Sequence, residues 1–170
     1  YHFKTKKNLL FILARDIIYK LYRESRESMR GARSPLGALH LFVDAFFDFS
    51  ARDRDSLAFL TRLDPFSSLD LAYFPNADLF LVRDRYISLM VNSLQDGIDQ
   101  GVFADVDPHG VASLVWSMLW GAGCLHAEDG SLAGLREEAK AMLTCRLTCK
   151  TTSNTVSPVG DGPIPSGGVA

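Results

Sequence analysis

The recurrence of apolar residues at helical spacing is the feature that most constrains how this chain folds. Near its beginning the chain has an apolar residue at every fourth position, at Leu9, Leu13, Ile17 and Leu21. This spacing puts the side chains on one face of an α-helix, and similar stripes recur further along. No segment alternates apolar and polar residues for long, as a half-buried strand would. The sequence therefore predicts an all-α fold.

Start and stop signals divide the chain into helices. Ser34-Pro35 and Asp107-Pro108 each pair a capping side chain with Pro at the first helical position, and Gly101 is placed to end the helix before it. Turn-forming residues fill 65–76, and Pro75 is a further start signal. We expect helices over about residues 5–28, 34–49, 57–63, 78–100, 108–121 and 132–147, with the fifth ending around residues 121–123.

Charge is distributed unevenly along the chain, although the net charge is only -2. Residues 1–33 carry nine Lys and Arg against three acids, whereas residues 34–130 carry five Arg against fourteen acids. A basic end on an acidic body fits a protein that presents one end to phosphate. The basic residues 15–33 also fit a solvated helix face, so Lys4, Lys6 and Lys7 are the better candidates for DNA contact.

Several classes of protein are disfavoured by the sequence. No apolar run approaches the roughly 20 residues of a membrane span, and no secretory leader is present. Three cysteines, clustered late in the chain, favour a reducing, cytoplasmic location. No nucleophile elbow, phosphate loop or dinucleotide-binding glycine pattern occurs, so no enzymatic activity is predicted.

Two pairs of residues have the spacing of metal ligands, but neither makes a complete site. His40 and Asp44 lie one helical turn apart, and so do Cys145 and Cys149. His40 and Asp44 would either bind a metal or form a polar contact with each other. Cys145 and Cys149 would either bind a soft metal or form a redox pair. Each pair lacks further ligands at matching spacing, so we predict no metal and no cofactor.

The first ten residues, YHFKTKKNLL, resemble the end of the DNA-binding domain of the tetracycline-repressor (TetR) family. In that family an aromatic-His-Phe-Lys-x-Lys run closes the recognition helix, and a polar pair followed by two apolar residues opens the next helix. Lys7 stands where the family has an acidic residue. A second segment, Gly101-Val102-Phe103 followed by residues 105–108, resembles the joint before the penultimate helix of the TetR regulatory domain.

The resemblance implies a ligand-responsive transcriptional regulator, expected to be a repressor, without most of its helix-turn-helix head. Residues 1–8 would be the remnant of the head and 9–150 the ligand-binding and dimerisation domain. Residues 151–170 are rich in Ser, Thr, Gly and Pro and almost uncharged, so their composition predicts a disordered tail. The family places its DNA contacts at the end of the recognition unit, here Tyr1, His2, Lys4 and Lys6. Lys6 would meet a phosphate together with the N-terminus of the following helix, where free N–H groups favour an anion.

Aromatic residues crowd the middle of the chain, between residues 42 and 86. The resemblance implies an apolar effector pocket there, with polar groups such as Arg62, Asp64 and Ser88 to orient the ligand. The residues expected to line it are Phe46, Phe59, Arg62, Tyr86, Met90 and Trp116. Aromatic residues at helical spacing also pack as ordinary core, and the sequence leaves both interpretations open.

Small residues follow one line of the penultimate helix, at Ser113, Ser117 and Gly121, beside Trp116 and Trp120. Small side chains permit a close helix–helix approach. The resemblance implies a two-fold dimer in which the last two helices of each copy form a four-helix bundle. The expected interface residues are Ser113, Ser117, Trp120, Gly121, Leu135 and Met142. Packing within one chain against residues 78–100 is the alternative.

The resemblance also implies a mechanism in which effector binding favours a dimer geometry that no longer matches the operator DNA. The helix over residues 5–27 would transmit the change from pocket to head. The sequence also leaves two other classes of function open. One is a small helical enzyme or carrier for a hydrophobic molecule, without DNA binding, and the other is a purely structural dimerising module.

Overall fold

The computed structural model describes residues 6–63, 65, 78–129 and 133–148, and all regular structure in these ranges is helical. The helices are, in chain order, α1 (Lys6–Met29), α2 (Pro35–Arg52), α3 (Arg54–Leu63), α5 (Asp78–Asp99), α6 (Pro108–Asp129) and α7 (Ala133–Thr148). The predicted all-α class is confirmed. No helix in these ranges has the length and apolar character that crossing a bilayer requires.

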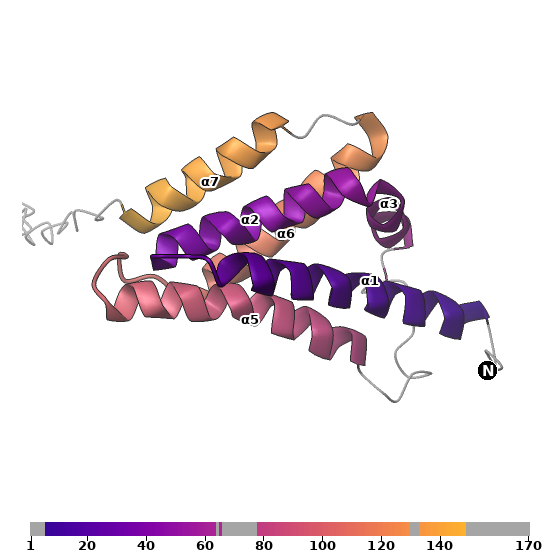
Figure 1. Cartoon of the computed structure of the whole chain (residues 1–170), viewed down its shortest axis with the longest axis horizontal. Helices are drawn as coiled ribbons and strands as arrows, with labels where there is room; N and C mark the ends of the chain where they lie inside the picture. The colour runs from indigo at the N-terminus through magenta and orange to yellow at the C-terminus, as the bar shows by residue number, and fades with distance from the viewer. Residues whose placement is uncertain (1–5, 64, 66–77, 130–132, 149–170) are drawn as a thin grey trace, which may run out of the picture.

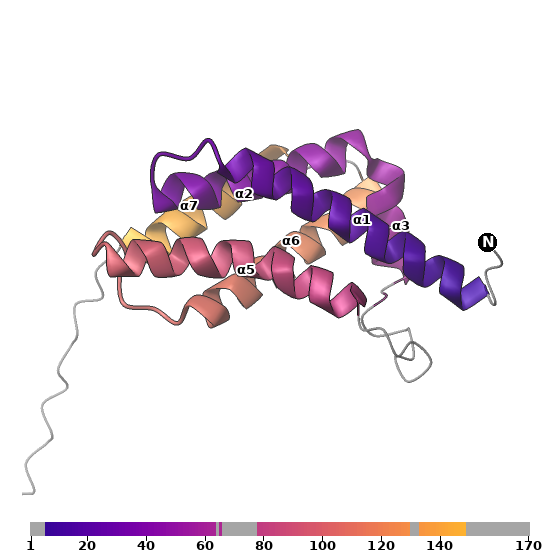
Figure 2. The ribbon, with the colours of Figure 1, turned by 60° about the horizontal axis from the view of Figure 1, so that its bottom comes forward.

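The helices pack as a layered bundle around α2, which contacts α1, α5, α6 and α7 (Figure 1). α1 lies against both α2 and α5, and its N-terminal end extends beyond the bundle (Figure 2). α6 contacts α3 and α5, while α7 lies along α2. The arrangement puts the beginning of α1 and the end of α7 at opposite ends of the molecule (Figure 1).

Capping side chains start the helices where the sequence predicted. The Ser34 hydroxyl accepts a hydrogen bond from the Gly37 backbone N–H at 3.1 Å, with Pro35 as the first residue of α2. The Asp107 carboxylate accepts from the N–H groups of His109 and Gly110, each at 3.0 Å. These bonds satisfy donors that have no partner within the helix.

The turn between α5 and α6 depends on two glycines. Gly101 has a φ of 67°, a conformation that side chains with a Cβ rarely adopt, and it ends α5 as expected. Gly97 lies against the buried ring of Phe103, and a Cβ added there would be 2.1 Å from a ring carbon. The turn folds back over α5 and is joined to α7 by a hydrogen bond from the Ala104 N–H to the Leu147 carbonyl.

α6 is longer than the sequence indicated, because it continues through Gly121 and Gly123 to Asp129. Gly123 permits a close contact with α3, since a Cβ there would lie 3.3 Å from the Leu57 methyl groups. The glycine therefore serves helix packing, and the end predicted at residues 121–123 is wrong.

Two groups of buried residues hold the bundle together. The main core fills the space between α2, α5, α6 and α7 and includes Leu39, Phe42, Phe46, Tyr86, Met90, Val115, Leu119, Ala139, Leu143 and Leu147. The small core lies between α1, α3 and the beginning of α5 and comprises Phe11, Ala14, Ile18, Leu60, Leu79 and Val82. Burial of this much apolar surface is the dominant stabilising contribution.

Candidate effector site and dimer surface

Tyr86 of α5 is the centre of an aromatic cluster in the main core. Its side chain is fully buried, with ring centroids 4.6 Å from Phe42 of α2 and 5.7 Å from Trp116 of α6. Trp116 is only partly buried and continues the cluster to Trp120, at a centroid distance of 5.2 Å. Tilted and edge-on aromatic pairs of this kind add stabilisation beyond that from the buried area. One side chain thus connects three helices.

Two buried hydroxyl groups occur where α1 packs on α5. Ser25 and Tyr86 are each 0% exposed, and neither hydroxyl has a hydrogen-bond partner among the described residues. Burial raises the pKa of the Tyr86 phenol, and the nearby Ser25 hydroxyl opposes this increase in part. The phenol is therefore protonated at physiological pH and is available as a donor.

An apolar groove runs between α6 and α7 on the surface. We refer to it as the α6–α7 groove; its volume is about 390 Å³, and it is lined by residues that include Ser117, Gly121, Leu125, Leu135, Glu138 and Met142. Leu125 and Met142 are each 54% exposed, and Leu114 on α6 is 67% exposed. Neighbouring exposed apolar side chains of this kind are typical of a protein–protein contact.

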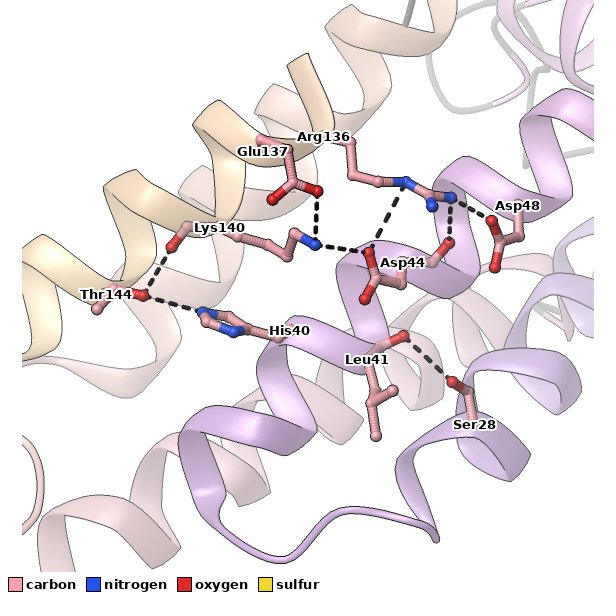
Figure 3. Close-up of polar contacts among 9 residues, drawn as sticks. All are labelled: Ser28, His40, Leu41, Asp44, Asp48, Arg136, Glu137, Lys140 and Thr144. Carbon is pink, nitrogen blue, oxygen red and sulfur yellow. Dashed lines mark hydrogen bonds and ion pairs between the residues drawn. The ribbon is translucent and has the colours of Figure 1, made fainter. Parts of the chain in front are cut away.

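Polar contacts along one face join α7 to α2 (Figure 3). Arg136 forms an ion pair with Asp48 and donates a hydrogen bond to the Asp44 backbone carbonyl at 3.2 Å. Lys140 bonds the Asp44 carboxylate at 3.1 Å, and His40 meets the Thr144 hydroxyl at 2.9 Å. We call these residues the α2–α7 polar ladder. The partners recur one helical turn apart on each helix, so the ladder fixes the register of α7 along α2.

This geometry determines which ring nitrogen of His40 donates the hydrogen bond. The Thr144 hydroxyl donates its proton to the Lys140 carbonyl, at 2.9 Å. The same hydroxyl oxygen can then only accept from His40, so the His40 Nε2 carries a proton. His40 thus pairs with Thr144, not with Asp44. No cluster of three or more potential metal ligands occurs within the part of the chain that the structure describes.

Comparison with solved structures identifies the fold. The TetR family transcriptional regulator PfmR from Thermus thermophilus superimposes with a TM-score of 0.69 at 23% identity, over 86% of this chain and 77% of that one. The chain has the TetR fold. The fatty acid degradation regulator FadR from Bacillus halodurans matches with a TM-score of 0.69 at 21% identity, over 83% and 76% of the two chains. No family model and no curated protein matches the sequence.

Within this TetR fold, the residues expected to line the effector site fall into two places. Phe46, Tyr86 and Met90 are buried in the main core, and Trp116 packs against it. Phe59 instead packs against the small core. With the exposed Arg62, it lines a shallow depression on α3. The structure therefore brings Phe46, Tyr86, Met90 and Trp116 together. It separates Phe59 and Arg62 from them.

The expected dimer residues are also partly grouped. Ser117, Gly121, Leu135 and Met142 line the α6–α7 groove, and Ser113 is exposed one turn before Ser117. Trp120 lies elsewhere, packed against the small core. Of the expected DNA contacts, Tyr1, His2 and Lys4 lie outside the described residues, and Lys6 is the first residue of α1.

Some residues of these sites were not singled out from the sequence. Ser25 gave no signal, because a serine on a charged helix is usually exposed. Arg136 was not singled out, and Asp44 was considered only with His40, because the contact between Asp44 and Arg136, 92 residues apart in sequence, depends on how α7 lies on α2. Leu125 lies beyond the expected end of the fifth helix, so it was not assigned to any face.

Proposed function

We propose that the protein is a ligand-responsive, DNA-binding transcriptional regulator, of which this chain forms the effector-binding and dimerisation body. The observation that carries the proposal is the TetR fold, shared with PfmR over 86% of the chain. The resemblance of residues 1–10 to the end of a TetR recognition unit is an independent, sequence-based argument for the same function.

The α6–α7 groove supports a homodimer. Its apolar side chains remain exposed in a single chain, and a second copy related by a two-fold axis would bury the same patch on both subunits. The two DNA-binding heads would then address two half-sites of a palindromic operator. Ser113, Ser117, Gly121, Leu135 and Met142 would be interface residues, and Trp120 would support the interface from the small core.

The aromatic cluster around Tyr86 supports an effector site beneath α1. Phe42, Tyr86 and Trp116 connect α2, α5 and α6, and Ser25 belongs to α1. A ligand that enters this cluster would move α1, which leads towards the expected DNA contacts. The aromatic lining of this cluster fits a largely hydrophobic effector.

Selection of DNA from a random pool by the full-length protein tests the proposal. We expect enrichment of an inverted repeat with half-sites about one helical turn apart. Substitution of Lys4 and Lys6 by Ala should weaken binding to all sequences and reduce the salt dependence. Recovery of no sequence, or of a sequence without an inverted repeat, would contradict the dimeric regulator.

A further inference from the structure

The exposed side of α7 indicates how a second copy of the chain occupies the α6–α7 groove. We propose that the two α7 helices lie antiparallel across the two-fold axis, with Met142 on the axis and Glu138 of each copy paired with Arg146 of the other. The proposal rests on the homodimer argued above. It adds the helix that enters the groove, the register of that helix and the charged residues that select it.

Three side chains follow the exposed side of α7 at intervals of four residues. Glu138, Met142 and Arg146 are all exposed, and Met142 is 54% exposed. Four residues are slightly more than one helical turn, so the three side chains lie within about 80° around the helix, with Met142 in the middle. An acid and a base are thus placed symmetrically, about 6 Å along the helix on either side of an apolar side chain.

The other charged residues of α7 are paired within the chain. Arg136 and Lys140 pair with acids of α2, and Glu137 pairs with Lys140. Glu138 and Arg146 have no ion-pair partner in the part of the chain that the structure describes. They are eight residues apart, whereas ion pairs within a helix join residues three or four apart. The two remaining charges are therefore opposite in sign and available to a partner.

Glu138 restricts which part of a second copy can enter the groove. It lines the groove together with apolar and small side chains, and burial of its carboxylate without a cation would be destabilising. The sequence of α6 contains no Lys or Arg, and Arg136 and Lys140 already have acidic partners. Arg146 of the second copy is therefore the cation that the two helices of the groove can supply.

Small residues of α6 leave room for a helix in the groove. Ser117, Gly121 and Ala122 line it. Among the described residues, no atom beyond the neighbouring turns of α6 lies within 4 Å of the position that a Cβ on Gly121 would take. Small side chains at a contact permit the closest distances between helix axes, about 8 Å. The α7 helix of a second copy can thus lie against α6 and α7 together.

Two-fold symmetry specifies the register. When two copies of one helix lie antiparallel across a two-fold axis, residues at equal distances on either side of the axis meet. With Met142 on the axis, Glu138 and Arg146 form two identical ion pairs on either side of a contact between the two Met142 side chains. A parallel arrangement would bring like charges together, and a shift of one turn would leave Glu138 without Arg146. The charges therefore favour a single arrangement.

Charge reversal on α7 of the full chain tests this register. Glu138→Arg places two bases opposite each other at both contacts, and Arg146→Glu places two acids there. Each variant alone should raise the dissociation constant of the dimer roughly tenfold, because two attractive pairs become repulsive. Mixing the two variants should restore the dimer, since the heterodimer has a base opposite an acid at both contacts. Sedimentation velocity at several concentrations and native mass spectrometry of the mixture measure these outcomes.

Matched controls make the same charge changes on another helix. Asp96→Arg and Arg85→Glu alter exposed residues of α5, and neither they nor their mixture should change the dissociation constant. A cross-link tests the position of the axis. With the three natural cysteines replaced by Ser, Met142→Cys should form a disulfide between the two copies on oxidation, because the two side chains face each other. Leu81→Cys in the same background should not.

Three results would overturn the proposed register while leaving the dimer in place. They are unchanged dissociation constants in both charge-reversal variants, a mixture that associates no more tightly than either variant alone, and the absence of a Met142→Cys disulfide. A monomeric unmodified chain would overturn the register and the dimeric regulator together. None of these measurements involves DNA, so operator selection can succeed while the register fails, and the two failures are distinguishable.

Discussion

Lys140 on α7 lies 3.1 Å from the Asp44 carboxylate on α2, and the Arg136 guanidinium lies 3.7 Å from the same oxygen. One carboxylate therefore serves two cations from the neighbouring helix. All three side chains are less than one-third exposed, so solvent screens these pairs less than ordinary surface pairs. The pKa of Lys140 is raised by its hydrogen bond to Glu137, and Asp44 adds to the effect.

Asp44→Asn should lower the free energy of unfolding by about 1 kcal/mol, because two partly buried cations lose their shared anion. Urea unfolding at neutral pH measures this change. Asp16→Asn is the control, since Asp16 pairs with the adjacent Arg15 on the surface, and it should change stability by less than about 0.5 kcal/mol. Equal losses in both variants would show that the α2–α7 polar ladder contributes nothing beyond a surface pair.

Acid should remove the stabilisation that Asp53 provides. Its pKa is lowered, first by the hydrogen bond from Lys20 at 2.7 Å and next by bonds from Ser56. A carboxyl with a lowered folded-state pKa stabilises above its unfolded pKa of about 4, and the contribution is lost as pH falls through the folded value. Asp53→Asn should cost about 0.5 kcal/mol at neutral pH, because it removes the charge that pairs with Lys20, and little in strong acid. Parallel stability curves for the two proteins below pH 5 would contradict this.

Two glycine substitutions should have opposite effects. Gly101→Ala forces a Cβ into a positive-φ conformation and should destabilise by about 1 kcal/mol. Gly134→Ala, in the first turn of α7 with open space around it, should stabilise by up to about 1 kcal/mol. Thermal unfolding of both variants checks the signs, and a loss at Gly134 would contradict the helical geometry there.

Leu125→Glu should convert the proposed dimer into a monomer, because it places a charge in the α6–α7 groove. Leu81→Glu is a closely matched control, since Leu81 is 53% exposed and Leu125 is 54% exposed, but Leu81 lies on α5. Sedimentation velocity at several concentrations distinguishes the species. A monomeric unmodified chain, or a dimeric Leu125→Glu variant, would count against the groove as the interface.

Local signals accounted for most of the helix boundaries. Ser34-Pro35, Asp107-Pro108 and Gly101 act through bonds and backbone angles within a few residues, so the sequence is sufficient to read them. The helix end predicted near Gly123 was wrong because this glycine is required by packing. A larger residue would crowd Leu57 on another helix, and the sequence does not show that contact. A glycine that serves packing and a glycine that ends a helix look alike in sequence.

The candidate sites were less predictable than the fold. Periodicity shows which residues face inward but not which residues meet, so Phe59 was grouped with Tyr86 although they belong to different cores. The α2–α7 polar ladder joins residues that are 88 to 104 positions apart. No spacing rule relates residues at such separation, because their meeting depends on the assembled bundle.

Ile17 on α1 packs against both the main core and the small core. Each core can accumulate compensating substitutions within its own set of neighbours, as long as its volume is kept. A residue that contacts both cores must satisfy two sets of neighbours at once. Over evolutionary time the two cores of such a protein can therefore diverge largely separately, whereas a substitution at position 17 changes the packing of both.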